Sequence, residues 1–282
     1  MRVLRSHDEL SQAERPDTRA VVMTMGALHE GHLALVRRAR ELADQVLVTI
    51  FVNPLQFNDP VDLERYPRTL ELDCALLASE GVDLVYAPEV DDLYPDGEPI
   101  ITVGAGRIGE VLEGAHRPGH FDGMLTVVLK LLVLADSDVA LFGQKDAQQL
   151  IAIRRMCRDF NIPVEIVAVP TVREPDGLAL SSRNRFLARG DRKNALALSE
   201  ALLACVERAD YGDGPDGVLA AGYDVLARAD GVVLDYLAVI DPASCEPVPN
   251  DYRGEVVIAV AAKVGATRLI DNMPATIKGA RP

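Results

Sequence analysis

The sequence predicts an α/β fold: a Rossmann-like, doubly wound parallel sheet followed by a smaller C-terminal α+β domain. Three observations lead to this prediction. Strand-like and helix-like segments alternate through the first two thirds of the chain. The strand-like segments are continuous apolar runs, such as residues 45–52 (QVLVTIFV), which are typical of a parallel sheet covered on both faces. The last third instead places two helices before consecutive strands, an order typical of α+β domains.

The first domain is expected to begin with a buried strand at residues 20–24, which leads into a helix with apolar residues at helical spacing. The elements expected after it are strands at 45–52, 82–86, 139–142 and 164–169, and helices at 69–80, 121–135 and 146–160. This alternation predicts βαβ units, with helices on both faces of the sheet.

In the second domain, helices are expected at residues 191–209 and 217–229, separated by the loop YGDGPDG. Strands are expected at residues 232–240, 255–262 and 267–270. The boundary is placed near Thr171, which gives domains of residues 1–171 and 172–282. The second domain is expected to carry a Ser-Ser-Arg loop and to cover the site of the first.

Composition narrows the function classes. The net charge is −14, from 29 basic and 43 acidic residues, which argues against a general nucleic-acid or anionic-membrane surface. Neither a signal peptide nor an apolar run of membrane-spanning length is recognised, so a cytoplasmic protein is expected. Four scattered cysteines without a CxxC pair are expected to be free thiols: Cys74, Cys157, Cys205 and Cys245.

The segment MGALHEGH, residues 25–32, links the first strand to its helix and is the strongest chemical motif. A helix N-terminus offers unpaired N–H groups and partial positive charge, which suit a phosphate. His29 and His32 share a face if both lie in the first helical turn, and their rings add donors there. The alternative is a pair of structural histidines. Zinc is disfavoured, because HEGH is not HExxH and no third ligand is evident.

Polar residues also follow two other strands, where ligands bind in open α/β sheets. In FVNPLQF, the amides of Asn53 and Gln56 suit a substrate with hydroxyls and a carboxylate; solvent-facing turn amides are the alternative. In FGQKDAQQL, Gly143 allows close backbone approach and Lys145 suits a phosphate, although a solvated helix start explains the same residues.

The loop LSSRNRF adds two hydroxyls beside Arg183 and Arg185, which predicts a mobile, phosphate-seeking segment hinged at residues 175–177. An ordinary Ser-rich basic loop is the alternative. A GxGxxG match at residues 104–109, after an expected strand at 100–103, is interpreted as a decoy. It lacks the acidic residue about twenty positions later that a dinucleotide site requires.

Together these blocks resemble the pantoate–β-alanine ligase family, within the HIGH-type nucleotidyltransferase superfamily. The resemblance covers nearly the whole chain through TMGALHEGH, FVNPLQF with YPRTLELD, GHFDGMLTVVLKLL, FGQKDAQQL, PTVREPDGLALSSRNRFL and TRLIDN. HEGH is similar to the HIGH signature, and LSSR is similar to a KMSKS-type loop.

The resemblance implies an ATP-dependent ligase that joins (R)-pantoate to β-alanine through a pantoyl adenylate and releases AMP and diphosphate. It also implies Mg²⁺, a cytoplasmic homodimer, and neither nucleic-acid nor membrane partners. The implied catalytic residues are His29, His32 (in the acid role), Lys145, Ser181, Ser182 and Arg183. The implied ATP contacts are Met25, Gly26, Ala27, Leu28, His29, Glu30, Gly31, His32, Gly143, Gln144, Lys145, Asp146, Val172, Leu180, Ser181, Ser182 and Arg183.

By the same resemblance, Gln56 and Gln149 would hold pantoate, and the amine would enter near Gln56. The chain departs from the family at Leu180, where Met is frequent, and at Ala147, where Tyr is frequent. Acidic residues around Asp73 are fewer than in some relatives, so the metal ligands stay unassigned.

Two rival functions remain open on the sequence. A nucleotidylyltransferase would leave the nucleotide on a phosphorylated product and would need a basic acceptor pocket, which Gln56 and Gln149 disfavour. A non-catalytic nucleotide sensor would be expected to have lost part of the phosphate-handling set. AMP release measured with pantoate, with and without β-alanine, separates all three.

Overall fold

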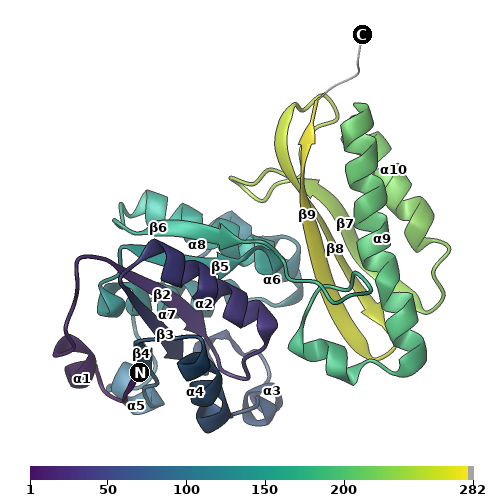
Figure 1. Ribbon diagram of the computed structural model, residues 1–282. Coiled ribbons are helices and arrows are strands. Elements are labelled where there is room, and N and C mark those ends of the chain that lie inside the picture. Colours follow the sequence, from purple (N-terminus) through teal and green to yellow (C-terminus); the bar gives the residue numbers. More distant parts are fainter. Residues whose placement is uncertain (279–282) are drawn as a thin grey trace. The chain divides into compact units, whose positions relative to one another are not determined.

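The computed structural model describes residues 1–278, and contacts divide the chain into two compact units (Figure 1). The first unit comprises Met1–Gly143 and Ala152–Val169, and the second comprises Gln144–Ile151 and the residues from Pro170 on. The short segment Gln144–Ile151 therefore groups with the C-terminal part of the chain. The domains of residues 1–171 and 172–282, with the second covering the site of the first, stay a prediction.

The first unit is built on a six-stranded sheet in which every pairing is parallel. Its strands are β1 (Arg2–Leu4), β2 (Arg19–Thr24), β3 (Gln45–Ile50), β4 (Leu84–Tyr86), β5 (Val139–Gly143) and β6 (Glu165–Val169). The order β1-β4-β3-β2-β5-β6 puts β3 and β4 on one side of β2, and β5 and β6 on the other. The order therefore reverses between β2 and β5, where open α/β sheets bind ligands. The predicted doubly wound parallel sheet is confirmed.

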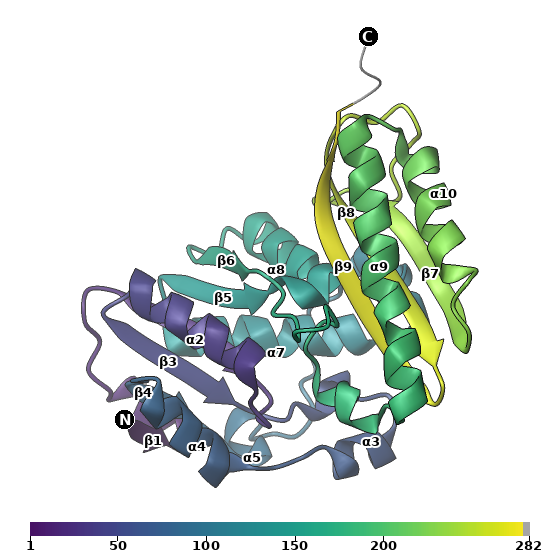
Figure 2. The same ribbon diagram turned by 45° about the vertical axis from the view of Figure 1, so that its right-hand side comes forward.

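Helices cover both faces of this sheet, as Figure 2 shows for α2 and α7. The helices are α1 (His7–Ser11), α2 (Glu30–Leu42), α3 (Pro60–Arg65), α4 (Leu70–Ser79), α5 (Val90–Leu93), α6 (Glu113–His116), α7 (His120–Ala135) and α8 (Ala147–Asp159). Short 3₁₀ turns lie at η1 (Pro54–Gln56), η2 (Gly106–Glu110), η3 (Gln144–Asp146) and η4 (Ser182–Phe186). On one face, Val36 of α2 and Leu77 of α4 share a fully buried cluster with strand residues such as Val48.

The second unit contains a three-stranded antiparallel sheet, β7-β8-β9, covered by two helices (Figure 1). Its elements are α9 (Arg189–Tyr211), α10 (Pro215–Leu226), β7 (Val232–Ile240), β8 (Gly254–Val264) and β9 (Thr267–Ile277). Leu198 and Leu202 of α9 are buried in the same core as Ile258 and Val260 of β8. Antiparallel strands covered by helices confirm the α+β prediction for this part of the chain.

Two expected elements were wrong in detail. Residues 100–103 form no strand, and Ile100 and Ile101 are exposed, because no neighbouring strand pairs with this segment. The last strand runs to Ile277 rather than ending at residue 270. Polar residues and Pro274 interrupt its apolar pattern, but β9 is an edge strand, where a proline is tolerated. The short strand β1, which pairs with β4, was not predicted.

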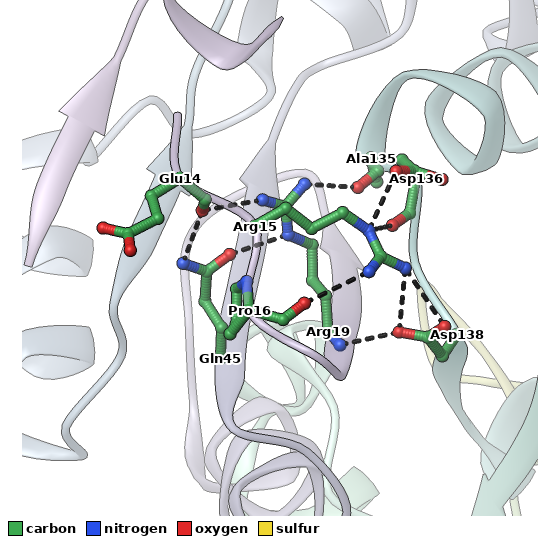
Figure 3. Close-up of polar contacts among 8 residues, drawn as sticks. All are labelled: Glu14, Arg15, Pro16, Arg19, Gln45, Ala135, Asp136 and Asp138. Carbon is green, nitrogen blue, oxygen red and sulfur yellow. Dashed lines mark hydrogen bonds and ion pairs between the residues drawn. The ribbon is translucent and has the colours of Figure 1, made fainter. Parts of the chain in front are cut away.

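A hydrogen-bonded network ties together the amino ends of β2, β3 and β5 (Figure 3). Arg19, only 3% exposed, donates from Nε to Gln45 Oε1 at 2.7 Å and from Nη1 to the Ala135 carbonyl at 2.7 Å. Its Nη2 donates to the Glu14 carbonyl at 3.1 Å, and its backbone N–H donates to Asp138 at 2.8 Å. Burial lowers the pKa of this guanidinium from its ordinary value.

All four cysteines are free, as expected. Burial raises the pKa of Cys205 to about 11 and that of Cys245 to about 12, so both thiols stay protonated near neutral pH. In residues 1–278, no helix combines the length and the apolar character needed to cross a membrane.

Candidate functional site

The turn after β2 places backbone N–H groups around a buried carboxylate. Gly26 has φ +82° and Ala27 has φ +52°, both in the left-handed region. The Asp73 carboxylate, from α4, accepts from the N–H groups of Ala27 at 3.0 Å and Leu28 at 2.8 Å, and from the Thr69 hydroxyl at 3.0 Å. These bonds offset the cost of a strained non-glycine residue at 27. Asp73, itself 2% exposed, therefore fixes the entry to α2.

His29 and His32 form a reciprocal cap at the start of α2. His29 is the N-cap, and its Nδ1 accepts from the Gly31 N–H at 3.1 Å. His32, at the third helical position, accepts from the His29 N–H through its own Nδ1 at 3.2 Å. This is the arrangement of a capping box, made here by two imidazoles. The ring centroids lie 4.1 Å apart, so the rings are neighbours, although His29 is the N-cap and not a residue of the first helical turn.

The cap also fixes where a neutral ring carries its proton. Because backbone N–H groups donate to both Nδ1 atoms, each neutral imidazole is protonated at Nε2. Each Nε2–H is then a donor at a helix N-terminus, where negative charge is favoured. The structural and phosphate-binding interpretations of the pair are therefore compatible, since they use different ring nitrogens.

The Gln56 side chain, in η1, is oriented by its neighbours. Asn53 donates to Gln56 Oε1 at 3.1 Å and to the Gly123 carbonyl at 3.1 Å, while Tyr94 donates to Asn53 Oδ1 at 3.0 Å. Gln56 Nε2 donates to the Met25 sulfur at 3.3 Å. The buried Asn53, 1% exposed, therefore sets which end of the Gln56 amide is a donor. It is a positioning residue rather than a solvent-facing turn amide.

Helix α7 holds η1 at unusually close range. A Cβ on Gly123 would lie 2.2 Å from the Leu55 carbonyl oxygen, so only glycine permits this approach. The His120 ring donates from Nδ1 to the Gln56 carbonyl at 2.8 Å, and its Nε2 lies 3.2 Å from Arg117 Nη1. The block GHFDGM therefore positions Gln56, a link that the sequence order alone did not reveal.

In the second unit, several predicted phosphate contacts line one pocket. Lys145, Ser181 and Arg183 face it together with Arg268 and Asp271 of β9. Arg268 and Asp271 were not predicted, although the TRLIDN block contained them and was the sign that could have identified them. Arg268 pairs with Asp235 at 2.6 Å and Asp271 pairs with Arg173, so Lys145 and Arg183 make this a cationic pocket in an acidic protein.

The loop that leads to the pocket is held by a network of charged and polar contacts. Glu174 accepts from Arg192 at 2.7 Å and from Asn184 at 2.7 Å. The Arg192 guanidinium, together with Asn184, lowers the pKa of Glu174. Arg192 also donates to Asp176 at 2.7 Å, beside Gly177 with φ +95°. Hinge motion of this turn stays a prediction.

The remaining predicted site residues divide between the units. Met25 through His32, Gln56 and Gly143 belong to the first unit, and Lys145, Gln149 and the Ser-Ser-Arg segment belong to the second. Gly143 ends β5 with open space at its Cβ position, as a close ligand approach requires. The other second-unit positions are Gln144 and Asp146 in η3, Val172 and Leu180 joined by a backbone hydrogen bond, and Ser182 in η4.

In residues 1–278, no group of three or more His, Cys, Asp or Glu side chains could hold a metal ion. The zinc interpretation therefore gains no support. Asp73, the carboxylate considered for a metal, already accepts three hydrogen bonds on its two oxygens. These residues fit a loop anchor better than a resident metal site.

Comparisons with known proteins agree with one another. A family profile described as pantoate-beta-alanine ligase matches residues 2–274. A pantothenate synthetase of Streptomyces avermitilis is 51% identical, over 99% of this chain and 98% of that protein. The crystal structure of pantothenate synthetase from Thermus thermophilus has a TM-score of 0.90 at 46% identity, over 97% of this chain and 99% of that one. A Francisella tularensis pantoate-beta-alanine ligase, crystallised with beta-gamma ATP and beta-alanine, has a TM-score of 0.76 at 35% identity, over 97% of each chain.

Proposed function

The chain belongs to the pantoate–β-alanine ligase family, and we propose from this premise that it condenses pantoate with β-alanine in an ATP-dependent reaction that yields pantothenate. The observation that carries the proposal is the family match from residue 2 to residue 274. The cationic pocket of the second unit and the capped histidine pair of the first supply groups that the reaction needs. The Francisella relative, named for a complex with an ATP compound and beta-alanine, supports the same substrates.

The reaction proceeds in two steps in this proposal. A pantoate carboxylate oxygen attacks the α-phosphorus of ATP, the bond to the bridging oxygen breaks, and diphosphate leaves with its electron pair. The unprotonated amine of β-alanine then attacks the acyl carbon of pantoyl adenylate, AMP leaves, and the amine loses a proton. The protein positions the reactants and stabilises charge, and no covalent enzyme intermediate is required.

The histidine pair acts on phosphate charge in this scheme. ATP contacts residues 25–32, with the Nε2–H groups of His29 and His32 directed to phosphate oxygens. Support comes from the cap, which presets both tautomers before any ligand arrives. A donor set in advance costs no reorganisation during the reaction, which is how electrostatic catalysis lowers a barrier. His32 takes the acid role by donating toward the departing phosphate.

In the second unit, Lys145, Ser181, Ser182 and Arg183 hold the phosphates. Gly143, Gln144, Asp146, Val172 and Leu180 complete the nucleotide contacts. Gln56 and Gln149 hold pantoate, and the orientation of the Gln56 amide by Asn53 supports a defined donor at that site. Leu180 replaces the family's frequent Met with an apolar residue of similar volume, so contact with the nucleotide is retained.

Magnesium enters this proposal with the substrate. ATP-bound Mg²⁺ usually keeps several waters and takes few protein ligands. That chemistry agrees with the absence of a three-ligand cluster among residues 1–278. The ion neutralises part of the phosphate charge, and the protein's own contribution is the cationic pocket.

The test is to supply the purified protein with MgATP and pantoate and to follow ATP–diphosphate exchange. Exchange that needs pantoate, but not β-alanine, supports the adenylate step. AMP and pantothenate should form in equal amounts once β-alanine is added. Pantoate labelled with ¹⁸O in its carboxylate should pass label to AMP. Exchange that needs all three substrates, or AMP free of label, would exclude the adenylate route.

The family resemblance also supports a cytoplasmic homodimer. Each chain has a mass of 30.5 kDa, so sedimentation should report a species of about twice that mass, a dimer being the commonest closed assembly. A single species at the monomer mass across the working concentration range would refute the dimer.

A further inference from the structure

Two successive residues of β9, Asp271 and Asn272, connect the segments that supply the cationic pocket. Both are buried in the second unit, at 5% and 6% exposure. Neither was assigned a role from the sequence. Successive side chains of a strand point in opposite directions, so one short stretch of strand can hold two separate pieces of chain.

Asn272 holds the segment that carries Lys145. Its Nδ2 donates to the Gln144 carbonyl at 2.9 Å and to the Lys145 carbonyl at 2.8 Å. Both hydrogens of one amide are thus used on two successive carbonyls of η3. These bonds help to explain why Gln144–Ile151 groups with the second unit although its sequence neighbours belong to the first.

Asp271 holds the loop that leads to Ser181. Its carboxylate accepts two hydrogen bonds from Arg173, at 2.7 and 3.0 Å, in the bidentate geometry that fixes direction as well as distance. Arg173 also donates to the Gly177 carbonyl at 3.0 Å. An isolated antiparallel β-bridge then pairs Arg173 with Ala179, two residues before Ser181. The Asn272 N–H donates to Asp271 at 2.8 Å and locks the two anchors together.

We propose that Asp271 and Asn272 are positioning residues that set Lys145 and the Ser181–Arg183 segment at a fixed separation. The second unit thereby contains an assembled site for the phosphates of ATP before the nucleotide binds. The inference rests on the proposed function, because it takes the pocket of Lys145, Ser181 and Arg183 as the phosphate site. In this proposal neither residue binds the nucleotide: Asp271 lines the pocket, but Arg173 occupies both of its carboxylate oxygens.

The expected effect is largest for ATP. Asn272→Ala leaves two carbonyls without their donor and frees the backbone that carries Lys145. Misplacement by about 1 Å can cost up to roughly 100-fold in rate. We therefore expect kcat/KM for ATP to fall about 10-fold to 100-fold, mainly through KM. The KM for β-alanine should stay within about twofold, since its proposed entry is near Gln56 in the first unit, whereas the KM for pantoate is expected to rise less than that for ATP, because Gln149 lies on the anchored segment.

A double-mutant cycle tests whether Asn272 acts through Lys145. The enzymes compared are the wild type, Lys145→Ala, Asn272→Ala and the double variant. If the proposal holds, Asn272→Ala has little further effect on kcat/KM for ATP once Lys145 has been replaced. Asn272→Ser, which keeps one donor, should be intermediate, and it serves as the variant of choice should the alanine protein not fold.

Asn250→Ala is the matched control. Asn250 is also an asparagine of the second unit whose side chain bonds to the backbone, accepting from the Asp216 N–H at 3.1 Å, but it does not line the pocket. Asn250→Ala should leave kcat/KM for ATP unchanged. Independent, additive effects of Asn272→Ala and Lys145→Ala, or equal losses for all three substrates, would overturn the inference. If Lys145→Ala left kcat/KM for ATP unchanged, the pocket would not be the phosphate site, and the inference would fall with it.

Discussion

At the scale of single residues, the histidine pair shows how one motif can serve fold and chemistry together. Each Nδ1 completes a hydrogen bond to the helix start, which leaves Nε2 as the proton-bearing atom of a neutral ring. The three-residue spacing thus has a structural cause, in line with the alternative of two structural histidines; the cap itself was not predicted, because histidine is an unusual capping residue. The spacing predicted nearness of the rings, and only the structure defines their tautomers.

Replacing His32 by alanine should lower the rate of adenylate formation roughly 10²-fold to 10³-fold, because one preset donor to phosphate charge is lost. Single-turnover formation of pantoyl adenylate measures this directly. His7→Ala is the control, since His7 is an exposed histidine of the same unit. Adenylate formation at the wild-type rate in His32→Ala would remove this residue from the chemistry.

At the scale of elements, α7 and η1 of the first unit approach each other closely at Gly123. Gly123→Ala would put a methyl group 2.2 Å from the Leu55 carbonyl oxygen, and the helix must move to admit it. We expect a loss of stability of about 1–3 kcal/mol and a higher KM for pantoate, because Gln56 shifts with its turn. Thermal unfolding and steady-state kinetics measure the two effects.

The control for this substitution is Gly104→Ala, where a Cβ would meet open space. Its unfolding temperature and its KM for pantoate should match the wild type. If Gly123→Ala behaved like this control, the close approach of α7 would not determine the position of Gln56.

Arg19, at the amino ends of the strands, should matter for stability and not for turnover. Arg19→Met leaves two carbonyls and the Gln45 amide oxygen without their donors, at a cost of about 2–5 kcal/mol. Urea denaturation should show this loss, while kcat of the folded enzyme stays near the wild-type value. Arg155→Met, which breaks an exposed helical ion pair, should change the midpoint little. Equal midpoints for the two variants would contradict a structural role for the Arg19 network.

At the scale of the whole molecule, acid should weaken the same network. The Arg19 backbone N–H, together with Arg15, lowers the pKa of Asp138. A carboxyl with a depressed folded-state pKa contributes stability above its unfolded value, about 3.9, and loses that contribution as pH falls through the folded value. Asp138→Asn should therefore be less stable than the wild type near pH 7, and the difference should shrink below about pH 4. Urea midpoints across this range test it; a difference independent of pH would refute it.

Local patterns were sufficient for much of the fold and for the motif residues. Continuous apolar runs identified the buried parallel strands, because both faces of β3 are covered by helices, and helical spacing identified α2. The same patterns missed β1, whose three residues carry too little periodicity, and cut β9 short at its polar residues. The polar residues that ended the expected strand, Asp271 and Asn272, are the ones that hold the pocket together.

The sequence by itself determined which segments become buried strands and helices and which residues could bind phosphate, because apolar patterning and charge are local properties of the sequence. Tertiary structure decided strand order, the anchoring of the Ala27–Leu28 turn by Asp73, and the membership of Gln144–Ile151 in the second unit. The Asp73 anchor spans 46 residues and the Asn272 anchor spans 128. Local periodicity does not predict such contacts, because each depends on where folding places a carboxylate or an amide that is distant in the sequence.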